Sequence, residues 1–223
     1  MDEFYVGRWD QANIPIKMRG RDFRHYEPAT GTTGKPHKTG EAAFQAARDF
    51  VDHFSEHYVS PERAKAGKFP NNRDNIGKGL LFFGHNGTRK STLAAAILTE
   101  VQYRNIGYSG LYIRFSEWQR ALQDTYDKEL TERKVRALQL IDWAENRPLL
   151  VLDDIGQEYS TASGYTKTKF HELVRVRAEA ARPTILTSNI DLHAMRGIYG
   201  DSFESFRHEA FDAYPMIGKD TRL

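Results

Sequence analysis

A short glycine-containing segment that follows an apolar run is the feature that most constrains this chain. The run is Gly79-Leu80-Leu81-Phe82-Phe83, and the segment reads Gly84-His85-Asn86-Gly87-Thr88-Arg89-Lys90-Ser91-Thr92. With one departure it matches G-x-x-x-x-G-K-[ST], in which a buried strand enters a loop whose backbone N–H groups bind phosphate and a helix begins at the lysine. The pattern predicts that residues 84–92 bind nucleotide, with Lys90 on the β- and γ-phosphates and the Ser91 hydroxyl on Mg²⁺.

The departure is Arg89, which stands where the pattern has its second glycine. If the loop needs left-handed backbone there, a side chain costs roughly 1–2 kcal/mol. That cost corresponds to about a tenfold loss of affinity. We therefore expect ATP binding that is weakened but real.

Composition limits the classes of function that remain. The chain has 223 residues, enough for one α/β domain and a short appendage. Lys+Arg 32 against Asp+Glu 30 gives a net charge of +2, so any nucleic-acid contact must come from a local patch. The absence of cysteine excludes disulfides, thiol catalysis and Cys-type zinc sites. The apolar runs are too short to span a bilayer and the first residues lack a signal-peptide pattern, so we expect no membrane contact and a cytoplasmic location.

Local patterns divide the chain into an N-terminal arm and loop over residues 1–40 and a domain over 41–223, whose P-loop core starts at residue 79. Apolar positions at helical spacing predict one amphipathic helix over 41–58. Short apolar strands, which alternate with helical stretches, are expected at residues 80–83, 110–115, 149–153 and 183–188. Such alternation predicts an α/β fold with a parallel sheet flanked by helices.

A pair of carboxylates ends one of these strands. Leu149-Leu150-Val151-Leu152 is followed by Asp153 and Asp154. In P-loop sites the first acid holds the metal's water shell, and the second orients or deprotonates the attacking water. Glu158 is a second candidate for this base. The alternative is a buried strand that meets solvent at an acidic turn, and the P-loop in the same chain favours the nucleotide interpretation.

Asn189 follows the last predicted strand. A polar residue at the carboxyl end of the strand beside the P-loop strand can bind the γ-phosphate or the attacking water. The alternative is a helix cap, since Asn-Ile-Asp is a typical helix start. Its order and spacing relative to the other motifs favour the γ-phosphate role.

These motifs together resemble one family. The P-loop segment, Asp153-Asp154-Ile155-Gly156 and Pro183-Thr184-Ile185-Leu186-Thr187-Ser188-Asn189 resemble the DnaC/IstB-type AAA+ ATPases, which include bacterial and phage replicative-helicase loaders and transposition helper ATPases. The likeness extends to residues 12–19 and to the Gly-x-x-x-Arg ending at residues 218–222. It implies a P-loop NTPase fold with an AAA+ core. It also implies ATP and Mg²⁺ as cofactors and self-association through the ATP site. Because only residues 1–13 precede Ile14, we expect the separate N-terminal partner-binding domain of this family to be absent.

The resemblance also points to an arginine finger, which a neighbouring subunit would supply. The family's Gly-Asp/Glu-Arg-x-x-Ser/Asp-Arg reads here Gly200-Asp201-Ser202-Phe203-Glu204-Ser205-Phe206-Arg207, which places Arg207 one residue late. Such a finger contributes about 10³–10⁵ in rate, so a misplaced one would leave binding intact and hydrolysis slow. The alternative is a surface residue. Arg222 is a weaker candidate for sensing the γ-phosphate.

Two helical stretches, 116–127 and 131–146, carry aromatic and basic residues where this family contacts single-stranded DNA. They are Trp118, Arg120, Tyr126, Lys128, Arg133, Lys134 and Arg136. Aromatic rings stack on bases and cations meet phosphates. The alternative is a core stripe of Trp118, Leu122 and Tyr126 with a solvated charged face.

A possible zinc-protease signature, H-x-x-E-H, occurs at His53-Phe54-Ser55-Glu56-His57. The alternative is that the two histidines lie on the polar side of a charged amphipathic helix. The nucleotide motifs favour the latter.

We therefore expect a helicase-loader ATPase that binds ATP·Mg²⁺, single-stranded DNA and a hexameric DnaB-like helicase. A transposition helper of the IstB type is one alternative. The other is an adaptor that binds nucleotide without hydrolysing it, which Arg89 and Arg207 favour and the intact acidic pair opposes.

Overall fold

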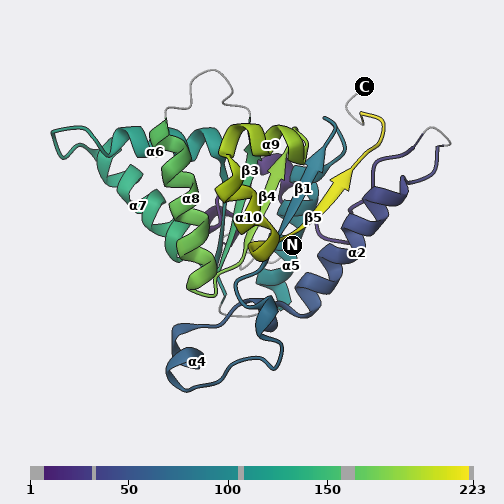
Figure 1. The fold of residues 1–223 in the computed structure, drawn as a ribbon, viewed down its shortest axis with the longest axis horizontal. Helices are drawn as coiled ribbons and strands as arrows, with labels where there is room; N and C mark the ends of the chain where they lie inside the picture. Colours follow the sequence, from purple (N-terminus) through teal and green to yellow (C-terminus); the bar gives the residue numbers. More distant parts are fainter. Residues whose placement is uncertain (1–7, 32–33, 105–107, 157–163, 221–223) are drawn as a thin grey trace.

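A single parallel sheet forms the centre of the molecule. The computed structural model describes residues 8–31, 34–104, 108–156 and 164–220. The strands follow the order β2-β3-β4-β1-β5, and every neighbouring pair is parallel (Figure 1). Their bounds are β1 (Gly79–Gly84), β2 (Gly110–Arg114), β3 (Leu149–Ile155), β4 (Thr184–Ser188) and β5 (Phe211–Met216). The predicted α/β fold with a parallel sheet is confirmed, and four strands lie where the alternation predicts them.

The fifth strand, β5, has no clear signal in the sequence. It pairs only with β1, so one of its edges faces away from the sheet, and its residues are buried, partly buried and exposed without strict alternation. Pro215 lacks an N–H and is tolerated in a strand at such an edge. β5 therefore owes its conformation to its partner strand.

Helices cover both faces of the sheet. One face carries α5 (Lys90–Arg104) and α2 (Lys38–Asp52), with a core that includes Leu93, Ile97 and Phe50. The other face carries α6 (Phe115–Asp124), α7 (Glu132–Asn146), α8 (Gly164–Glu179), α9 (Leu192–Tyr199) and α10 (Asp201–Ala210). Helix α5 is buried on nearly all sides, and its alanines allow the sheet to approach closely. Helix α5 begins at Lys90, after the loop that follows the end of β1 at Gly84, as a P-loop requires.

The single helix predicted over 41–58 is wrong in its extent. The structure has α2 to Asp52 and a separate short helix, α3 (Phe54–His57), with His53 between them at φ −110°. The change of direction buries both Phe54 and His57. A periodicity that continues through the break cannot reveal it.

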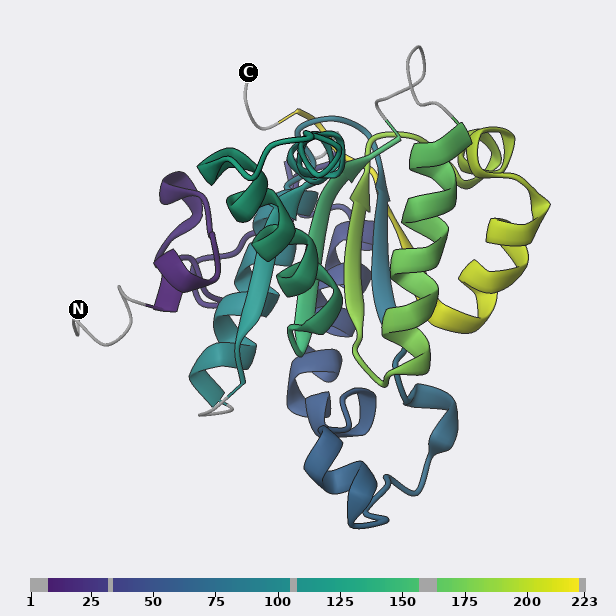
Figure 2. The ribbon, with the colours of Figure 1, turned by 90° about the vertical axis from the view of Figure 1, so that its left-hand side faces the viewer.

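The N-terminal segment packs into the same core as the sheet. Trp9, Ala12 and Ile14 are buried there, and the Tyr112 backbone N–H in β2 donates to the Ala12 carbonyl at 2.7 Å. Figure 2 shows this segment beside the edge strand β2. A 3-10 turn (Ile16–Met18) then leads to the loop that precedes α2. The boundary at residue 40 stays a prediction.

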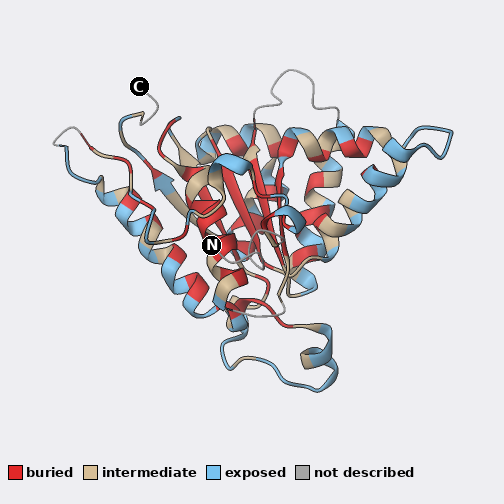
Figure 3. Cartoon of the chain, turned by 180° about the vertical axis from the view of Figure 1, so that it is seen from behind, coloured by how far each residue is buried: buried red, intermediate tan, exposed pale blue. Residues whose placement is uncertain are grey.

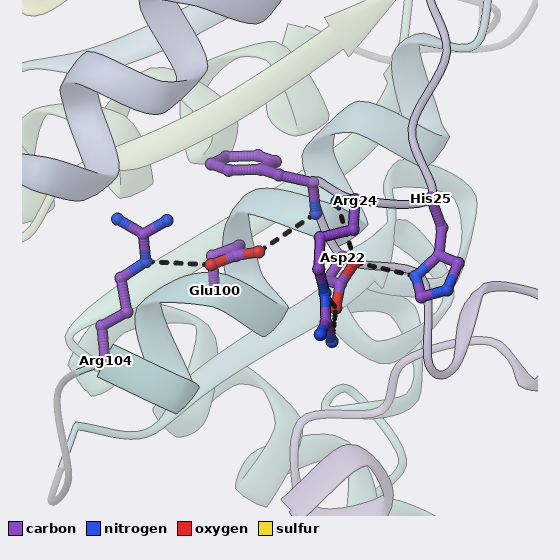
Figure 4. A network of polar contacts seen from close by, with 6 residues as sticks. Asp22, Arg24, His25, Glu100 and Arg104 are labelled. Atoms are coloured by element: carbon purple, nitrogen blue, oxygen red, sulfur yellow. Dashed lines mark hydrogen bonds and ion pairs between the residues drawn. The ribbon is translucent and has the colours of Figure 1, made fainter.

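Polar contacts fix this segment onto α5. The Glu100 carboxylate accepts from the Phe23 backbone N–H at 3.0 Å and from Arg104 Nε at 2.9 Å (Figure 4). Asp22 accepts from the Arg24 backbone N–H and contacts His25 Nδ1 at 2.8 Å. The chain around residue 22 is thereby held close to the helix that begins at the P-loop.

Residues 60–78 project from the amino ends of the strands. They contain α4 (Pro61–Lys65) and a 3-10 turn (Arg73–Asn75), and most of their side chains are exposed (Figure 3). Among the described residues, none of the helices has the length and apolar character needed to cross a bilayer.

Candidate nucleotide-binding site

Two positions in the loop after β1 lie so close to neighbouring atoms that only glycine fits there. Gly87 has φ +69°, and a Cβ there would lie 1.7 Å from Oδ1 of Asp220. Gly84 has φ +128°, and its Cβ would lie 2.5 Å from the Met216 carbonyl oxygen in β5. Both predicted glycines are therefore required by the path of the backbone.

Arg89 adopts the left-handed conformation that the pattern assigns to glycine. Its φ is +66°, so the predicted backbone strain is present. The guanidinium extends away from the loop, where Nη1 donates to the Glu27 carbonyl at 3.0 Å and lies 3.6 Å from the Glu27 carboxylate. The side chain that strains the loop therefore also ties it to the N-terminal segment.

Lys90, the first residue of α5, is buried inside the loop. Its Nζ donates to the Gly84 carbonyl at 3.0 Å and to the His85 carbonyl at 2.6 Å. The Thr88 hydroxyl donates to the same His85 carbonyl at 2.8 Å. An ammonium group is thus held at the centre of the loop by oxygen acceptors.

Asp153 is buried, and two hydroxyl groups hold its carboxylate in place. Its two carboxylate oxygens accept from Tyr112 Oη and from Thr187 Oγ1, each at 2.6 Å. Burial, and then the charge of Asp153, raise the pKa of Tyr112, so the phenol stays a neutral donor. Tyr112 also hydrogen-bonds Ser91, which links the acid to the start of α5.

Asp154 and Asn189 contact each other directly. Asn189 Nδ2 donates to Asp154 Oδ1 at 2.5 Å, and Asp154 has a left-handed φ of +65°. The Thr187 hydroxyl also accepts from the Asp154 backbone N–H at 2.9 Å. Asn189 does not cap the next helix, because Asp191 takes that position and accepts from the Ala194 N–H. The cap interpretation of Asn189 is therefore wrong.

These groups converge on one cavity of about 600 Å³. Of the predicted site residues, it is lined by Gly87, Thr88, Arg89, Lys90, Ser91, Thr92, Asp153, Asp154 and Asn189. The other three predicted residues, Gly84, His85 and Asn86, do not line it, although the Gly84 and His85 carbonyls accept from Lys90. Five lining residues were not predicted from the sequence: Met18, Arg21, Arg114, Ser116 and Thr187. Tyr112 is a further residue that sequence reasoning missed, because nothing in a buried strand marks which side chain bonds the acid.

Arg207 lies elsewhere, in α10. Its side chain is 5% exposed, and Nε and Nη2 donate to the two Glu204 carboxylate oxygens at 3.1 and 2.7 Å. This contact lowers the pKa of Glu204. The guanidinium therefore has a partner in its own subunit. Glu158 and Arg222 lie outside the described residues.

The α6–α7 region combines a core stripe with an exposed aromatic pair. Trp118 and Leu122 are buried in the core, as predicted by the alternative interpretation, in which they belong to a core stripe. Tyr126 instead is 62% exposed, and its ring centroid lies 5.6 Å from that of Tyr165. Lys169 Nζ lies 5.8 Å from the Tyr165 ring centroid.

The three basic residues of α7 already have partners. Arg133 pairs with Asp124 at 2.6 Å, Arg136 pairs with Glu132 at 3.1 Å, and Lys134 Nζ donates to the Asp127 carbonyl at 2.6 Å. A bound phosphate would have to compete with these contacts.

The H-x-x-E-H segment does not form a metal site. Nδ1 of His53 contacts the Asp49 carbonyl and Nδ1 of His57 contacts the Lys78 carbonyl, both at 2.9 Å. No group of three potential ligands that could hold a metal occurs within the described parts of the chain. His57 is buried, so placing both histidines on the polar side of the helix is also wrong.

Comparison with known proteins yields helicase loaders. The chain is 34% identical over 122 residues to the replicative helicase loader DnaC of Escherichia coli K12, a match that covers 55% of this chain and 46% of DnaC. It is 28% identical over 148 residues to the replicative helicase loader DnaI of Bacillus subtilis, covering 66% of this chain and 39% of DnaI. The match thus spans less than half of these relatives. No family model matches the chain.

Solved structures give the same fold. A crystal structure of the DnaC helicase loader aligns with TM-score 0.66 and 20% identity over 91% of this chain and all of that chain. A structure of the replication initiator DnaA bound to AMPPCP and single-stranded DNA aligns with TM-score 0.60 and 14% identity over 88% of this chain and 50% of that one. The fold is that of a P-loop AAA+ domain, and the resemblance to DnaC-type helicase loaders is confirmed.

Proposed function

We propose that this chain binds ATP with Mg²⁺ in the cavity at the carboxyl ends of the strands and hydrolyses it. The observation that carries the proposal is the convergence of Lys90, Asp153, Asp154 and Asn189 on one cavity of about 600 Å³. That size suits a nucleotide. The Ser91 hydroxyl and the Asp153 carboxylate fit Mg²⁺, which prefers hard oxygen ligands. When bound, Mg²⁺ neutralises charge on the β- and γ-phosphates.

Each of these side chains has a defined task in the proposed reaction. Lys90 exchanges its loop carbonyls for phosphate oxygens. Asp154 orients or deprotonates the attacking water, and Asn189, already bonded to it, holds that water or the γ-phosphate. Tyr112 and Thr187 keep Asp153 in place.

Hydrolysis is expected to be slow. A finger that acts on the neighbouring subunit must present its guanidinium to that subunit, whereas Arg207 is buried and bonded to Glu204. This observation favours the second candidate, an adaptor that binds nucleotide without hydrolysing it. Self-association through the ATP site remains part of the first proposal, with Arg207 as its predicted catalytic contributor from the neighbour.

Phosphate release separates these two functions. The wild-type chain and Asp154→Asn are compared for binding of a slow ATP analogue and for phosphate release, with and without single-stranded DNA. An ATPase binds the analogue in both forms but loses about 10²–10⁴ in rate on substitution, the usual contribution of a general base. Equal rates in both proteins would exclude hydrolysis at this site. A wild-type chain that fails to bind the analogue would exclude the site itself.

We further propose action on a hexameric DnaB-like helicase during DNA replication. The support is the likeness to DnaC and DnaI, which are both named as replicative helicase loaders. A transposition helper of the IstB type is the alternative from the sequence motifs. Co-purification with a helicase would support the first, and co-purification with a transposase would contradict it.

For single-stranded DNA, we propose that Tyr126 and Tyr165 form the contact, together with Lys169. Exposed rings offer stacking surfaces to bases, and a nearby ammonium attracts phosphate. The DnaA structure of the same fold holds single-stranded DNA.

Tyr126→Leu tests this contact, with Tyr126→Phe as its matched control because it keeps the flat ring. We expect single-strand affinity, measured by fluorescence anisotropy, to fall about 5- to 100-fold in the leucine variant alone. Equal losses in both variants would show that the hydroxyl, and not stacking, matters. Unchanged affinity in Arg133→Ala/Lys134→Ala/Arg136→Ala would exclude the α7 cations.

A further inference from the structure

An arginine that no sequence motif singles out lies in the nucleotide cavity. Arg114 is the last residue of β2, and its register partner in β3 is Asp153. It lines the cavity together with Lys90, Asp153 and Asp154. Strand β2 lies directly beside β3, which ends in the two acids. The Arg114 guanidinium therefore reaches the cavity from the same subunit as Asp153 and Asp154.

The Arg114 side chain has no structural task. Arg114 is the N-cap residue of α6, but its side chain makes no capping hydrogen bond to that helix. Within the described part of the chain, no hydrogen bond or ion pair holds its guanidinium, and the side chain is exposed to the cavity. A long side chain with a planar, permanently charged end is therefore available to a ligand.

Arg114 lies on the side of the cavity that carries the acids. Its register partner is Asp153, whose carboxylate accepts from the Tyr112 hydroxyl at 2.6 Å and is one of the groups proposed to hold Mg²⁺. The guanidinium thus lies within electrostatic reach of the place where phosphate charge would accumulate.

Arg114 and Arg207 differ in how available their guanidinium groups are within one subunit. Phosphoryl transfer spreads negative charge over three oxygens, and an arginine that stabilises it can come from a neighbouring subunit or from the same one. The Arg207 side chain is 5% exposed, and its Nε and Nη2 both donate to the Glu204 carboxylate. Arg114 is exposed in the cavity beside the acids.

We propose that Arg114 is a catalytic arginine that contacts the γ-phosphate of the nucleotide bound in its own subunit. This inference rests on the proposed ATPase function. It assigns to β2 a positive charge that acts within the subunit, beside the role proposed for Arg207 from a neighbouring subunit.

The test measures kcat for phosphate release and, separately, the affinity for a slow ATP analogue. Arg114→Ala and Arg114→Lys are compared with Arg48→Ala, which changes an exposed arginine of α2 that does not line this cavity. We expect Arg114→Ala to lower kcat about 10²–10³-fold, with a much smaller change in affinity. Arg114→Lys should recover only part of the rate, because an ammonium cannot bind two oxygens with a planar fork. Arg48→Ala should keep both values.

Mixing two inactive variants decides which subunit Arg114 serves. Arg114→Ala subunits have an intact Asp154, and Asp154→Asn subunits have an intact Arg114. An arginine that acts in its own subunit gives no recovery of activity on mixing, whereas one that acts on a neighbour restores part of it. Recovery would overturn the inference.

Three other results would also overturn it. They are an unchanged kcat in Arg114→Ala, a loss confined to affinity, and a wild-type chain that binds the analogue without releasing phosphate. The last leaves nucleotide binding intact. Failure of the wild-type chain to bind the analogue at all would instead refute the proposed function on which the inference depends.

Discussion

The two ends of the sheet bury charged side chains in opposite ways. At the amino ends of β3 and β4, the fully buried Arg177 guanidinium forms no ion pair with the residues that the structure describes. It donates instead to the Thr184 hydroxyl and to the carbonyls of Ala144, Glu145, Arg147 and Pro183. Burial lowers the pKa of Arg177 to about 9. At the carboxyl ends, Lys90 and Asp153 are almost as buried, but they line a cavity.

This difference separates structural from functional burial. Every direction around Arg177 is filled by protein, so its hydrogen bonds fasten the end of α7 to the start of β4. Lys90 and Asp153 are also satisfied by protein atoms, yet each has a side that faces the cavity. Left-handed backbone does not follow this division, because Arg89 and Asp154 adopt it beside the cavity and Ala181 adopts it shortly before the start of β4.

The largest effect is expected at the amino ends. Arg177→Met would leave several buried carbonyls without a donor and destabilise the fold by about 3 kcal/mol or more. Thermal unfolding should then occur about 6–12 °C lower. Arg175→Met, on the exposed side of the same helix, is the control and should cost less than about 1 kcal/mol. Equal losses in the two variants would contradict the structural role.

At the carboxyl ends, Lys90→Ala should impair binding and spare the fold. Losing a charged donor to phosphate costs about 1.5–3 kcal/mol, or roughly 10- to 150-fold in affinity for an ATP analogue measured by calorimetry. The melting temperature should stay the same or rise, since a buried charge is removed. Lys65→Ala on the projecting α4 controls for net charge. A large loss of stability in Lys90→Ala would end the contrast between the two ends.

Arg89 allows strain to be measured apart from contact. Arg89→Ala loses the Glu27 contact but keeps a Cβ at φ +66° and therefore the backbone strain. Arg89→Gly loses the Glu27 contact and the strain together. We expect the glycine variant to bind the ATP analogue about tenfold more tightly than the alanine variant, which reflects roughly 1–2 kcal/mol of strain. Equal affinities would mean that the loop holds no such strain. Failure of Arg89→Gly to exceed the wild-type affinity would show that the Glu27 contact outweighs it.

The smallest effect concerns pH. Burial lowers the pKa of His57 from its ordinary value of 6.5, so the folded chain keeps this ring neutral where the unfolded chain protonates it. This contribution to stability is complete above about pH 6.5 and is lost as the pH falls through the folded pKa. It amounts to less than about 1.4 kcal/mol per pH unit.

Urea unfolding at pH 7.5 and pH 5.5 checks this point. His57→Gln should lose less stability on acidification than the wild type. Part of the dependence should remain, because burial also lowers the pKa of His171. An identical loss in both proteins would show that His57 does not contribute.

Much of the site could be predicted because its parts are contiguous in sequence. The loop at residues 84–92, the acids after β3 and Asn189 after β4 each carry their own local signal, and parallel strands bring such strand ends to one edge. The pattern raised left-handed backbone at residue 89 as a condition for strain, and Arg89 has it at φ +66°. Tyr112, Arg21 and Arg114 had no such signal, because a single side chain in a strand or loop does not show which neighbour it meets.

The sequence by itself determined the α/β fold and the positions of the candidate nucleotide loop and of the acids that follow β3, since periodicity and motif spacing are local properties of the chain. Only the tertiary structure decided that β5 completes the sheet, that Asp191 and not Asn189 caps α9, and that Arg207 is buried against Glu204. It alone also placed Arg114 beside Asp153. The physical reason is that burial and partner choice depend on contacts between residues far apart in the chain, which form only when the sheet and its helices have packed.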